Sequence, residues 1–219
     1  MKYKYLLFDL DGTLIDTREG VLKSAQHALN HYGIRKDWTE LMPFFGPPLK
    51  YSFTKIYGLT DEQADEAIRI YLDRYSEKGC IESKVFDAIP DILVKLKSLG
   101  YILGVATSKY EGHAVESLES HGIAQYFEYI TGATIDESIS TKHEVIEESL
   151  KRFGITDNRS DVLMIGDMKY DVIGAKNAGI DSLGIYTGTA QANEHEDAGA
   201  TYVAYDFNEL DRMLTKELV

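Results

Sequence analysis

Short apolar runs recur along the chain, and patterns of helical spacing separate them. Each run is hydrophobic at successive positions rather than at alternate ones, which is typical of a strand that is buried on both faces. The expected strands are residues 5–8, 102–106, 162–165 and, more weakly, 182–186. Residues 91–99 and 144–153 place apolar side chains at helical spacing, and each pattern stops at a glycine. This alternation predicts an α/β fold with a doubly wound, mostly parallel, Rossmann-like sheet.

The segment after the first strand breaks this rhythm, because no second strand is evident before residue 84. Residues 19–32 and 61–78 each carry apolar side chains on one helical face instead. An aromatic and proline-rich stretch, residues 43–48, lies between them. We therefore predict an α-helical insertion at residues 17–83, called the cap below, in a core that is built from residues 1–16 and 84–219.

Composition and charge narrow the possible partners. The chain has 219 residues, of which 44% are hydrophobic and 27% charged, as is ordinary for a globular protein. Its 36 acidic residues against 23 basic ones give a formal charge of −13. Polynucleotides and anionic membranes would be repelled by this charge, so neither is an expected partner. A small anionic substrate remains compatible, provided that its site supplies cations.

Cysteine content and the first residues indicate the compartment. Cys80 is the only cysteine, which excludes an intramolecular disulfide and a thiolate metal cluster. Asp9 interrupts the first apolar run too early for a signal peptide, and every apolar run is too short to cross a bilayer. We expect a cytoplasmic protein.

Carboxylates follow two of the predicted strands. Asp9 and Asp11 come directly after the first strand, and side chains two apart on an extended chain share a face. Asp167 follows the third strand, and Asp171 lies one helical turn further on. Ligands of open α/β sheets bind at the carboxyl ends of the strands, so neighbouring strands would assemble an oxygen-rich site suited to Mg²⁺. An ordinary turn or helix cap is the alternative for the first pair.

Two hydroxyl residues follow the second predicted strand, and a lysine stands at the start of a predicted helix. Thr107 and Ser108 come after the second strand, where hydroxyls and free backbone N–H groups suit a phosphate but also suit an ordinary helix cap. Lys142 stands at the start of a helix, where the helix dipole disfavours a cation. It is either a solvated surface lysine or one that faces an acidic cluster and a phosphate.

Together these motifs resemble those of the haloacid dehalogenase-like hydrolase superfamily. The four motifs occur in the superfamily's order, and the predicted cap follows the first of them, as in the phosphoglycolate phosphatase and β-phosphoglucomutase branch. Residues 45–49 and 166–171 look most like those of 5′-nucleotidase-like members. His143 departs from the proline that follows the lysine in many relatives, although the nucleotidase-like members also lack that proline. The motifs are Asp9-x-Asp11-x-Thr13, Thr107, Lys142 and Gly166-Asp167-x-x-x-Asp171.

The resemblance implies a role for each motif residue. Asp9 would be the nucleophile that forms an aspartyl-phosphate, and Asp11 the acid and base. Thr107, Ser108 and Lys142 would bind the phosphoryl group. Mg²⁺ would lie on the Asp9 carboxylate, the Asp11 backbone carbonyl and Asp167. The supporting residues would be Gly12, Thr13 and Asp171.

The same resemblance implies a Mg²⁺-dependent phosphomonoester hydrolase that acts on a small phosphorylated metabolite. A nucleoside 5′-monophosphate is the expected substrate, and phosphoglycolate, a sugar phosphate or a β-phosphoglucomutase-like phosphomutase reaction are the alternatives. A dehalogenase is disfavoured, because it needs neither Asp11 nor Asp167. A phospho-accepting switch domain is disfavoured, because such a domain does not need a cap over its site. We expect a monomer or a weak homodimer.

The predicted cap offers weaker candidates for substrate contact. Gly46, Pro47 and Lys50 are the cap residues that we expect near the substrate. Nearby aromatic rings either stack on a nucleobase or simply pack the cap. These rings belong to Phe44, Phe45, Tyr51, Phe53 and Tyr57.

Overall fold

The larger part of the chain and an inserted segment form two compact units. A computed structural model describes residues 2–45, 47–136 and 138–218. One unit combines Met1–Ile15 with Val85–Val219, and the other is Asp16–Lys84. At the junctions the chain forms two short strands, β2 (Ile15–Asp16) and β3 (Lys84–Val85), which pair with each other. The sequence pattern did not reveal β2, because two residues carry no periodicity.

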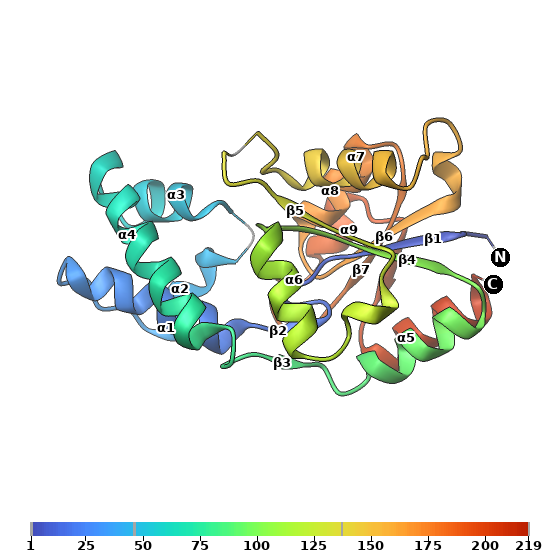
Figure 1. Ribbon diagram of the computed structural model, residues 1–219, viewed down its shortest axis with the longest axis horizontal. Coiled ribbons are helices and arrows are strands. Elements are labelled where there is room, and N and C mark those ends of the chain that lie inside the picture. Colours follow the sequence, from blue (N-terminus) through green and yellow to red (C-terminus); the bar gives the residue numbers. More distant parts are fainter. Residues whose placement is uncertain (1, 46, 137, 219) are drawn as a thin grey trace. The chain divides into compact units, whose positions relative to one another are not determined.

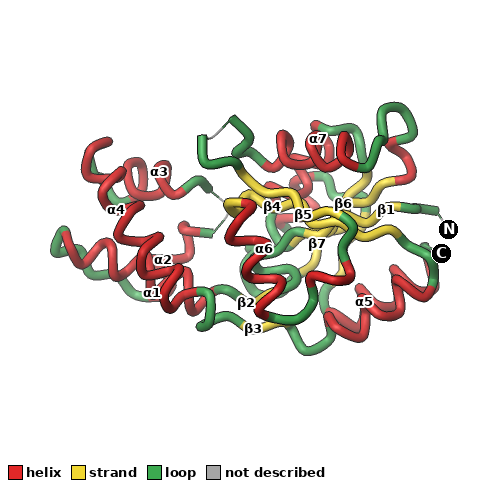
Figure 2. Tube along the Cα trace, viewed as in Figure 1, coloured by secondary structure: helices red, strands yellow, loops and turns green. Residues whose placement is uncertain are grey.

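A six-stranded sheet forms the centre of the larger unit (Figures 1 and 2). Its order is β5-β4-β1-β6-β7-β8, and every pair of neighbours is parallel. The first strand of the chain therefore lies inside the sheet, between β4 and β6. This arrangement confirms the predicted doubly wound α/β fold. The strands are β1 (Tyr5–Phe8), β4 (Ile102–Tyr110), β5 (Tyr129–Ala133), β6 (Val162–Gly166), β7 (Asp181–Ile185) and β8 (Tyr202–Ala204).

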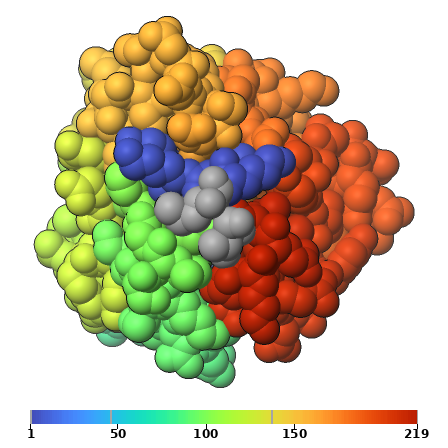
Figure 3. Space-filling model, turned by 90° about the vertical axis from the view of Figure 1, so that its right-hand side faces the viewer, coloured from blue at the N-terminus to red at the C-terminus, as the bar shows by residue number. Residues whose placement is uncertain are grey.

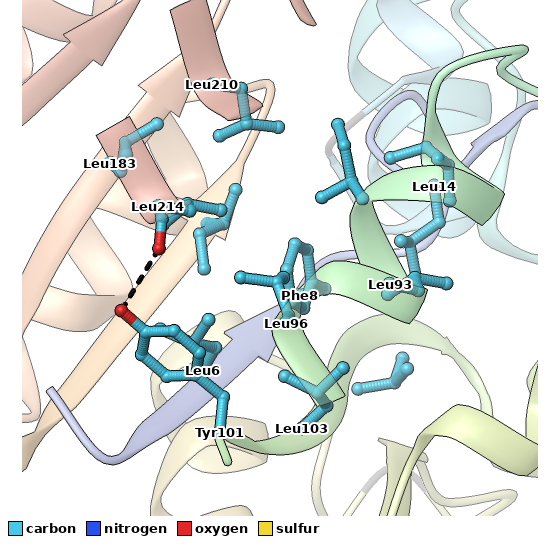
Figure 4. Close-up of a cluster of buried hydrophobic side chains, with 14 of the residues drawn as sticks. Leu6, Phe8, Leu14, Leu93, Leu96, Tyr101, Leu103, Leu183, Leu210 and Leu214 are labelled. Carbon is cyan, nitrogen blue, oxygen red and sulfur yellow. Dashed lines mark hydrogen bonds between the residues drawn. The ribbon is translucent and has the colours of Figure 1, made fainter. Parts of the chain in front are cut away.

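Helices cover both faces of this sheet, because successive side chains of a strand point to opposite sides. Leu6 and Phe8 of β1 pack in one apolar cluster with α5, α6 and α10 (Figure 4), whereas Leu7 packs in another with α7 and α8. The helices are α5 (Ile89–Ser98), α6 (Glu111–Ser120), α7 (Lys142–Arg152), α8 (Lys169–Asn177), α9 (Glu194–Ala198) and α10 (Phe207–Arg212). Single 3₁₀ turns lie at Ala124–Tyr126 and Arg159–Asp161, and a π turn, Met213–Glu217, continues α10.

The N-terminal segment is enclosed by later parts of the chain. Figure 3 shows it in blue across the middle of one face, between orange, green and red segments. Backbone hydrogen bonds of 2.9 and 2.8 Å join Lys2 to Leu218 and Lys4 to Asp161. Beneath this face, the Tyr101 hydroxyl donates to the Leu214 carbonyl at 3.1 Å (Figure 4). Hydrogen bonds thus connect the C-terminal residues both to the N-terminal segment and to Tyr101, the residue before β4.

In the smaller unit, helices and helical turns are joined by short loops, and the described residues form strand only at the two junctions. Gly20 of α1 lies close to the π turn that continues α4, because a Cβ built at Gly20 would lie 2.1 Å from the Gly79 carbonyl oxygen. Arg74 of α4 donates at 3.0 Å to Ser24 of α1 and, also at 3.0 Å, to Glu82 beyond the π turn. The elements are α1 (Arg18–His31), α2 (Trp38–Leu41), α3 (Leu49–Tyr51), α4 (Asp61–Arg74), the 3₁₀ turn Met42–Phe44, and the π turns Ser52–Ile56 and Tyr75–Gly79.

Among the described residues, none of the helices is both long and apolar enough to cross a membrane.

Candidate active site

The carboxyl ends of three neighbouring strands bring the predicted site residues together. Phe8, the last residue of β1, pairs with Val105 of β4 and with Ile165 of β6. Asp9 continues this pairing, since its amide donates to the Ile165 carbonyl at 2.8 Å. Asp167 directly follows Gly166, the last residue of β6. Residues far apart in the sequence therefore meet at one edge of the sheet, as expected for an open α/β fold.

Three carboxylates form the centre of this site. One side-chain oxygen each of Asp9, Asp167 and Asp171 lies within 4.8 Å of the others. All three residues are buried, with 8, 0 and 2% of their surfaces exposed. Asp171 comes from the first turn of α8, where its Oδ2 accepts a hydrogen bond from the Met168 amide at 3.1 Å. The sequence assigned Asp171 a supporting role, but the structure brings it into the cluster itself.

Lys142 supplies the positive charge of the cluster. Its Nζ lies 2.8 Å from Asp9 Oδ1 and 2.8 Å from Asp171 Oδ1, and it donates to the Ala106 carbonyl at 3.0 Å. Only 6% of the side chain is exposed. The lysine is the first residue of α7, whose N-cap is Thr141. Its place at the positive end of a helix is explained by these anionic partners rather than by the helix dipole.

Two glycines make room for the carboxylates. Gly12 adopts φ +86°, and a Cβ built there would lie 2.2 Å from Asp167 Oδ2. A Cβ on Gly166 would lie 2.1 Å from the carboxyl carbon of Asp171. A side chain at either position would displace the carboxylate that it faces, so both glycines allow the acids to keep their places in the cluster.

Asp11 lies beside this cluster and has a different partner. Both of its carboxylate oxygens accept hydrogen bonds from Lys109 Nζ at 2.9 Å. The lysine side chain is 9% exposed. The sequence did not single out Lys109, although its position two residues after Thr107, at the same strand end, was a usable signal. The Asp11 backbone carbonyl remains a predicted metal ligand, since only the side chain turns to Lys109.

Thr107 and Ser108 lie within β4 rather than at the start of a helix. The strand continues to Tyr110, which is itself the N-cap of α6, so the helix-cap alternative for Thr107 is wrong. The pairing of β4 with β5 shifts register between Ala106 and Tyr110. Thr107 is buried and accepts a hydrogen bond from the Lys109 amide at 3.2 Å, whereas Ser108 is exposed. Irregular strand ends of this kind are common beside active sites, because they redirect side chains.

Two threonines hold Asp167. Thr13, predicted to support the site, donates to Asp167 Oδ1 at 2.9 Å. Thr189 donates to Oδ2 from the loop after β7. The sequence missed Thr189, and the only available signal was its position just beyond the end of a predicted strand.

The electrostatics of the cluster favour a bound cation. Burial raises the pKa of Asp9 to about 6, because Lys142 offsets only part of this effect and the charge of Asp171 adds to it. Burial and the charges of Asp9 and Asp171 also raise the pKa of Asp167 well above its usual range. Burial alone would lower the pKa of Lys142, but the charges of Asp171 and Asp9 outweigh it and raise the pKa. Three buried carboxylates thus share one ammonium, and an oxygen-rich, electron-rich site of this kind fits Mg²⁺.

These pKa values predict how the stability of the metal-free protein depends on pH. A carboxyl whose pKa is higher in the folded state stabilises the fold below its unfolded pKa, and this contribution is lost as pH rises through the folded value. For Asp9 the loss therefore falls between the ordinary carboxyl value of 3.8 and the folded value of about 6, and it is complete soon above pH 6. We expect wild type to lose about 1 kcal/mol of unfolding free energy relative to Asp9→Asn between pH 5 and pH 7.5. Urea denaturation of both proteins in chelator measures this difference, and a difference that does not change with pH would contradict it.

The cap candidates lie in the smaller unit. Pro47 is partly buried, and Lys50 Nζ lies 2.8 Å from Asp65 Oδ1, while Gly46 lies outside the described residues. Most of the nearby rings pack the unit itself, as one of the two alternatives proposed. Phe44, Phe45 and Phe53 are buried, and Phe44 stacks on Tyr57 with ring centroids 4.9 Å apart. Tyr51 differs, because 53% of its surface is exposed.

Comparison with known proteins identifies the family. The family model for haloacid dehalogenase-like hydrolases matches residues 6–185, which include every predicted motif. The chain belongs to the haloacid dehalogenase-like hydrolase family. The predicted family and the predicted enzyme class, a phosphatase, are thereby confirmed.

Individual relatives of this haloacid dehalogenase-like chain carry different names. A 5′-nucleotidase of Pseudomonas aeruginosa is 36% identical over 98% of this chain and 96% of its own. The tyrosine-protein kinase PtkA of Mycobacterium tuberculosis is 37% identical over 91% of this chain and 68% of its own. A solved structure from Clostridium acetobutylicum, described as a predicted phosphatase, is 40% identical with a TM-score of 0.92, covering 98% of this chain and 99% of that one. These relatives share the family and differ in the activities that their names state.

Proposed function

We propose that this protein is a Mg²⁺-dependent phosphomonoesterase that hydrolyses a small phosphorylated metabolite through an aspartyl-phosphate on Asp9. The observation that carries the proposal is the buried Asp9 carboxylate, whose Oδ1 lies 2.8 Å from Lys142 Nζ. The Leu10 amide donates to the same oxygen at 2.7 Å. These two donors fix the orientation of the carboxylate, as in-line attack on phosphorus requires.

The covalent chemistry follows from the two aspartates that leave β1. An Asp9 oxygen forms a bond to phosphorus while the bond from phosphorus to the leaving oxygen breaks, and Asp11 gives its proton to that oxygen. Asp11 then takes a proton from water, which attacks phosphorus and breaks its bond to Asp9. Inorganic phosphate and free Asp9 result. Lys109 Nζ lies 2.9 Å from Asp11 Oδ1. Lys109 therefore has to release the carboxylate, or shift together with it, before Asp11 can carry the proton.

The remaining residues bind charge. Lys142 neutralises Asp9 and the transferring phosphoryl group, and Thr107 and Ser108 donate to phosphoryl oxygens. Mg²⁺ would be held by the carboxylates of Asp9 and Asp167 and the Asp11 backbone carbonyl, with Asp171 in direct support. When bound, the ion shields the negative charge that the carboxylates and the phosphoryl group bring together. Gly12 and Thr13 maintain the positions of Asp11 and Asp167.

A nucleoside 5′-monophosphate is the substrate that we propose. It is supported by the similarity to a 5′-nucleotidase, which extends over 98% of this chain and 96% of the relative. Phosphoglycolate, a sugar phosphate and a phosphomutase reaction are the alternatives that the assay must separate. Gly46, Pro47 and Lys50 are the proposed cap contacts, and Lys50 has to leave Asp65 before it can bind a substrate anion. We further propose a cytoplasmic monomer or weak homodimer without polynucleotide or membrane partners, in keeping with its charge of −13.

A phosphate-release assay tests this proposal. Purified protein is supplied with nucleoside monophosphates, phosphoglycolate, sugar phosphates and phosphotyrosine, each with Mg²⁺ and with chelator. We expect turnover that requires Mg²⁺ and is fastest with a nucleoside monophosphate. Turnover in chelator would contradict the metal role, and a faster sugar phosphate or phosphoglycolate would replace the proposed substrate. A need for a sugar bisphosphate activator would identify a mutase instead.

A further inference from the structure

We infer that Thr189 is a positioning residue that orients Asp167 for metal binding. The Asp167 side chain is fully buried, and each of its two oxygens accepts a hydrogen bond from one threonine hydroxyl. Thr13 binds Oδ1 and Thr189 binds Oδ2. A carboxylate that is held at both oxygens cannot rotate about its terminal bond without breaking a hydrogen bond, so the two hydroxyls together define its plane.

The need for such restraint comes from the neighbouring charges. Asp9 and Asp171 each place an oxygen within 4.8 Å of an Asp167 oxygen, whereas Lys142 forms its ion pairs with Asp9 and Asp171. Asp167 therefore experiences the repulsion of two carboxylates, and it forms no ion pair with a cationic side chain among the described residues. In the metal-free protein, hydroxyl donors are what keep its oxygens directed into the cluster.

The loop that carries Thr189 is itself tied to the site. It leaves β7, which pairs with β6 so that Gly184 lies opposite Gly166, the residue before Asp167. At its far end, Glu194 accepts hydrogen bonds from the Lys169 amide at 3.0 Å and from the Gln191 amide at 3.4 Å. Lys169 is the first residue of α8, the helix that contains Asp171. One loop thus contacts both Asp167 and the helix that positions Asp171.

Thr189 lies outside the family's matched segment, which ends at residue 185. The role of Thr189 therefore does not follow from the family match. It rests on the proposed function, because it presupposes the proposed Mg²⁺ site. It does not require Thr189 to touch either the metal or the substrate. A positioning role predicts a specific loss of metal affinity, whereas a purely structural role predicts a loss of stability alone.

Calorimetric titration of metal-free protein with Mg²⁺ separates these roles. We expect Thr189→Val, which removes only the hydroxyl, to weaken Mg²⁺ binding about tenfold. Thr189→Ser restores the hydroxyl and should remain within about threefold of wild type. The matched control is Thr201→Val, because Thr201 donates to Asp181 at 3.3 Å at the opposite end of β7. It should lose a comparable amount of stability in urea and keep wild-type affinity for Mg²⁺.

Each outcome of the titration has a distinct meaning. If wild type binds Mg²⁺ and Thr189→Val binds it equally well, Thr189 does not position Asp167 and the proposed function stands. If wild type itself does not bind Mg²⁺, the proposed metal site fails and this inference fails with it. Should Thr189→Val not fold, Thr189→Ala removes the same hydroxyl with a smaller side chain and gives the same readout. Weaker binding by Thr201→Val as well would also overturn the inference, since the loss would then follow stability.

Discussion

Replacing Asp9 by asparagine is expected to slow phosphomonoester turnover by at least ~10³-fold while the protein keeps its fold. The amide matches the carboxylate in shape but cannot form the acyl phosphate. Folding is preserved because Lys142 retains its ion pair with Asp171 at 2.8 Å, and one of three crowded negative charges is removed. Turnover at saturating substrate, with circular dichroism and a urea midpoint for the same samples, measures both parts of this expectation.

The control for this substitution is Asp91→Asn, which makes the same chemical change on the exposed side of α5. It should retain wild-type turnover. Near-normal activity of Asp9→Asn would rule out a covalent intermediate on this residue. A cleanly inactive but unfolded protein would instead show that the Asp9 charge is needed for the fold.

Replacing Lys142 by methionine should impair both stability and turnover. The substitution keeps most of the apolar stem but leaves Asp9, Asp167 and Asp171 buried without their ammonium group. Removing one partner of a buried ion pair typically costs about 3–5 kcal/mol, so we expect a loss of that order in metal-free protein at neutral pH. Turnover should fall by ~10²-fold or more, since charge on the phosphoryl group is no longer neutralised. Urea denaturation with and without Mg²⁺, together with the phosphate assay, provides the measurement.

Lys151→Met is the matched control, because Lys151 lies on the same helix with 79% of its side chain exposed. Its ion pair with Glu148 is at the surface, so its removal should change stability by about 1 kcal/mol or less. Mg²⁺ should recover part of the stability of Lys142→Met, because a cation can replace some of the lost charge. Equal stability of the two variants would mean that Lys142 is not the charge partner of the cluster.

The buried part of the fold could be predicted because its strands are covered on both faces. The apolar runs at residues 5–8 and 162–165 correspond to β1 and β6, and the sheet places β1 in its interior. The apolar pattern did not predict the edge strands β5 and β8, because they are less completely buried. Each has a neighbour on one side only and carries partly exposed positions, so neither forms a continuous apolar run.

Most of the candidate site could be predicted from residues that directly follow strands, since strand ends are where side chains converge. The side chains that those residues contact could not be predicted in this way. That Lys142 reaches Asp171 as well as Asp9 depends on how α7 and α8 pack, which no local pattern encodes. Thr189 meets Asp167 across a sequence separation of 22 residues, and a lone threonine in a loop has no spacing that marks it.

The interior position of β1 has a consequence for synthesis of the protein. Tyr5 emerges from the ribosome early, yet its register partners are Ile102 and Val162, which emerge much later. Until then the nascent first strand exposes Leu6, Leu7 and Phe8, with both of its backbone edges unpaired. Such delayed, non-local pairing makes folding slow and exposes the nascent chain to aggregation. The same delay means that Asp9, Lys142 and the remaining carboxylates meet only after Asp171 has been made, so shorter nascent chains carry no assembled cluster.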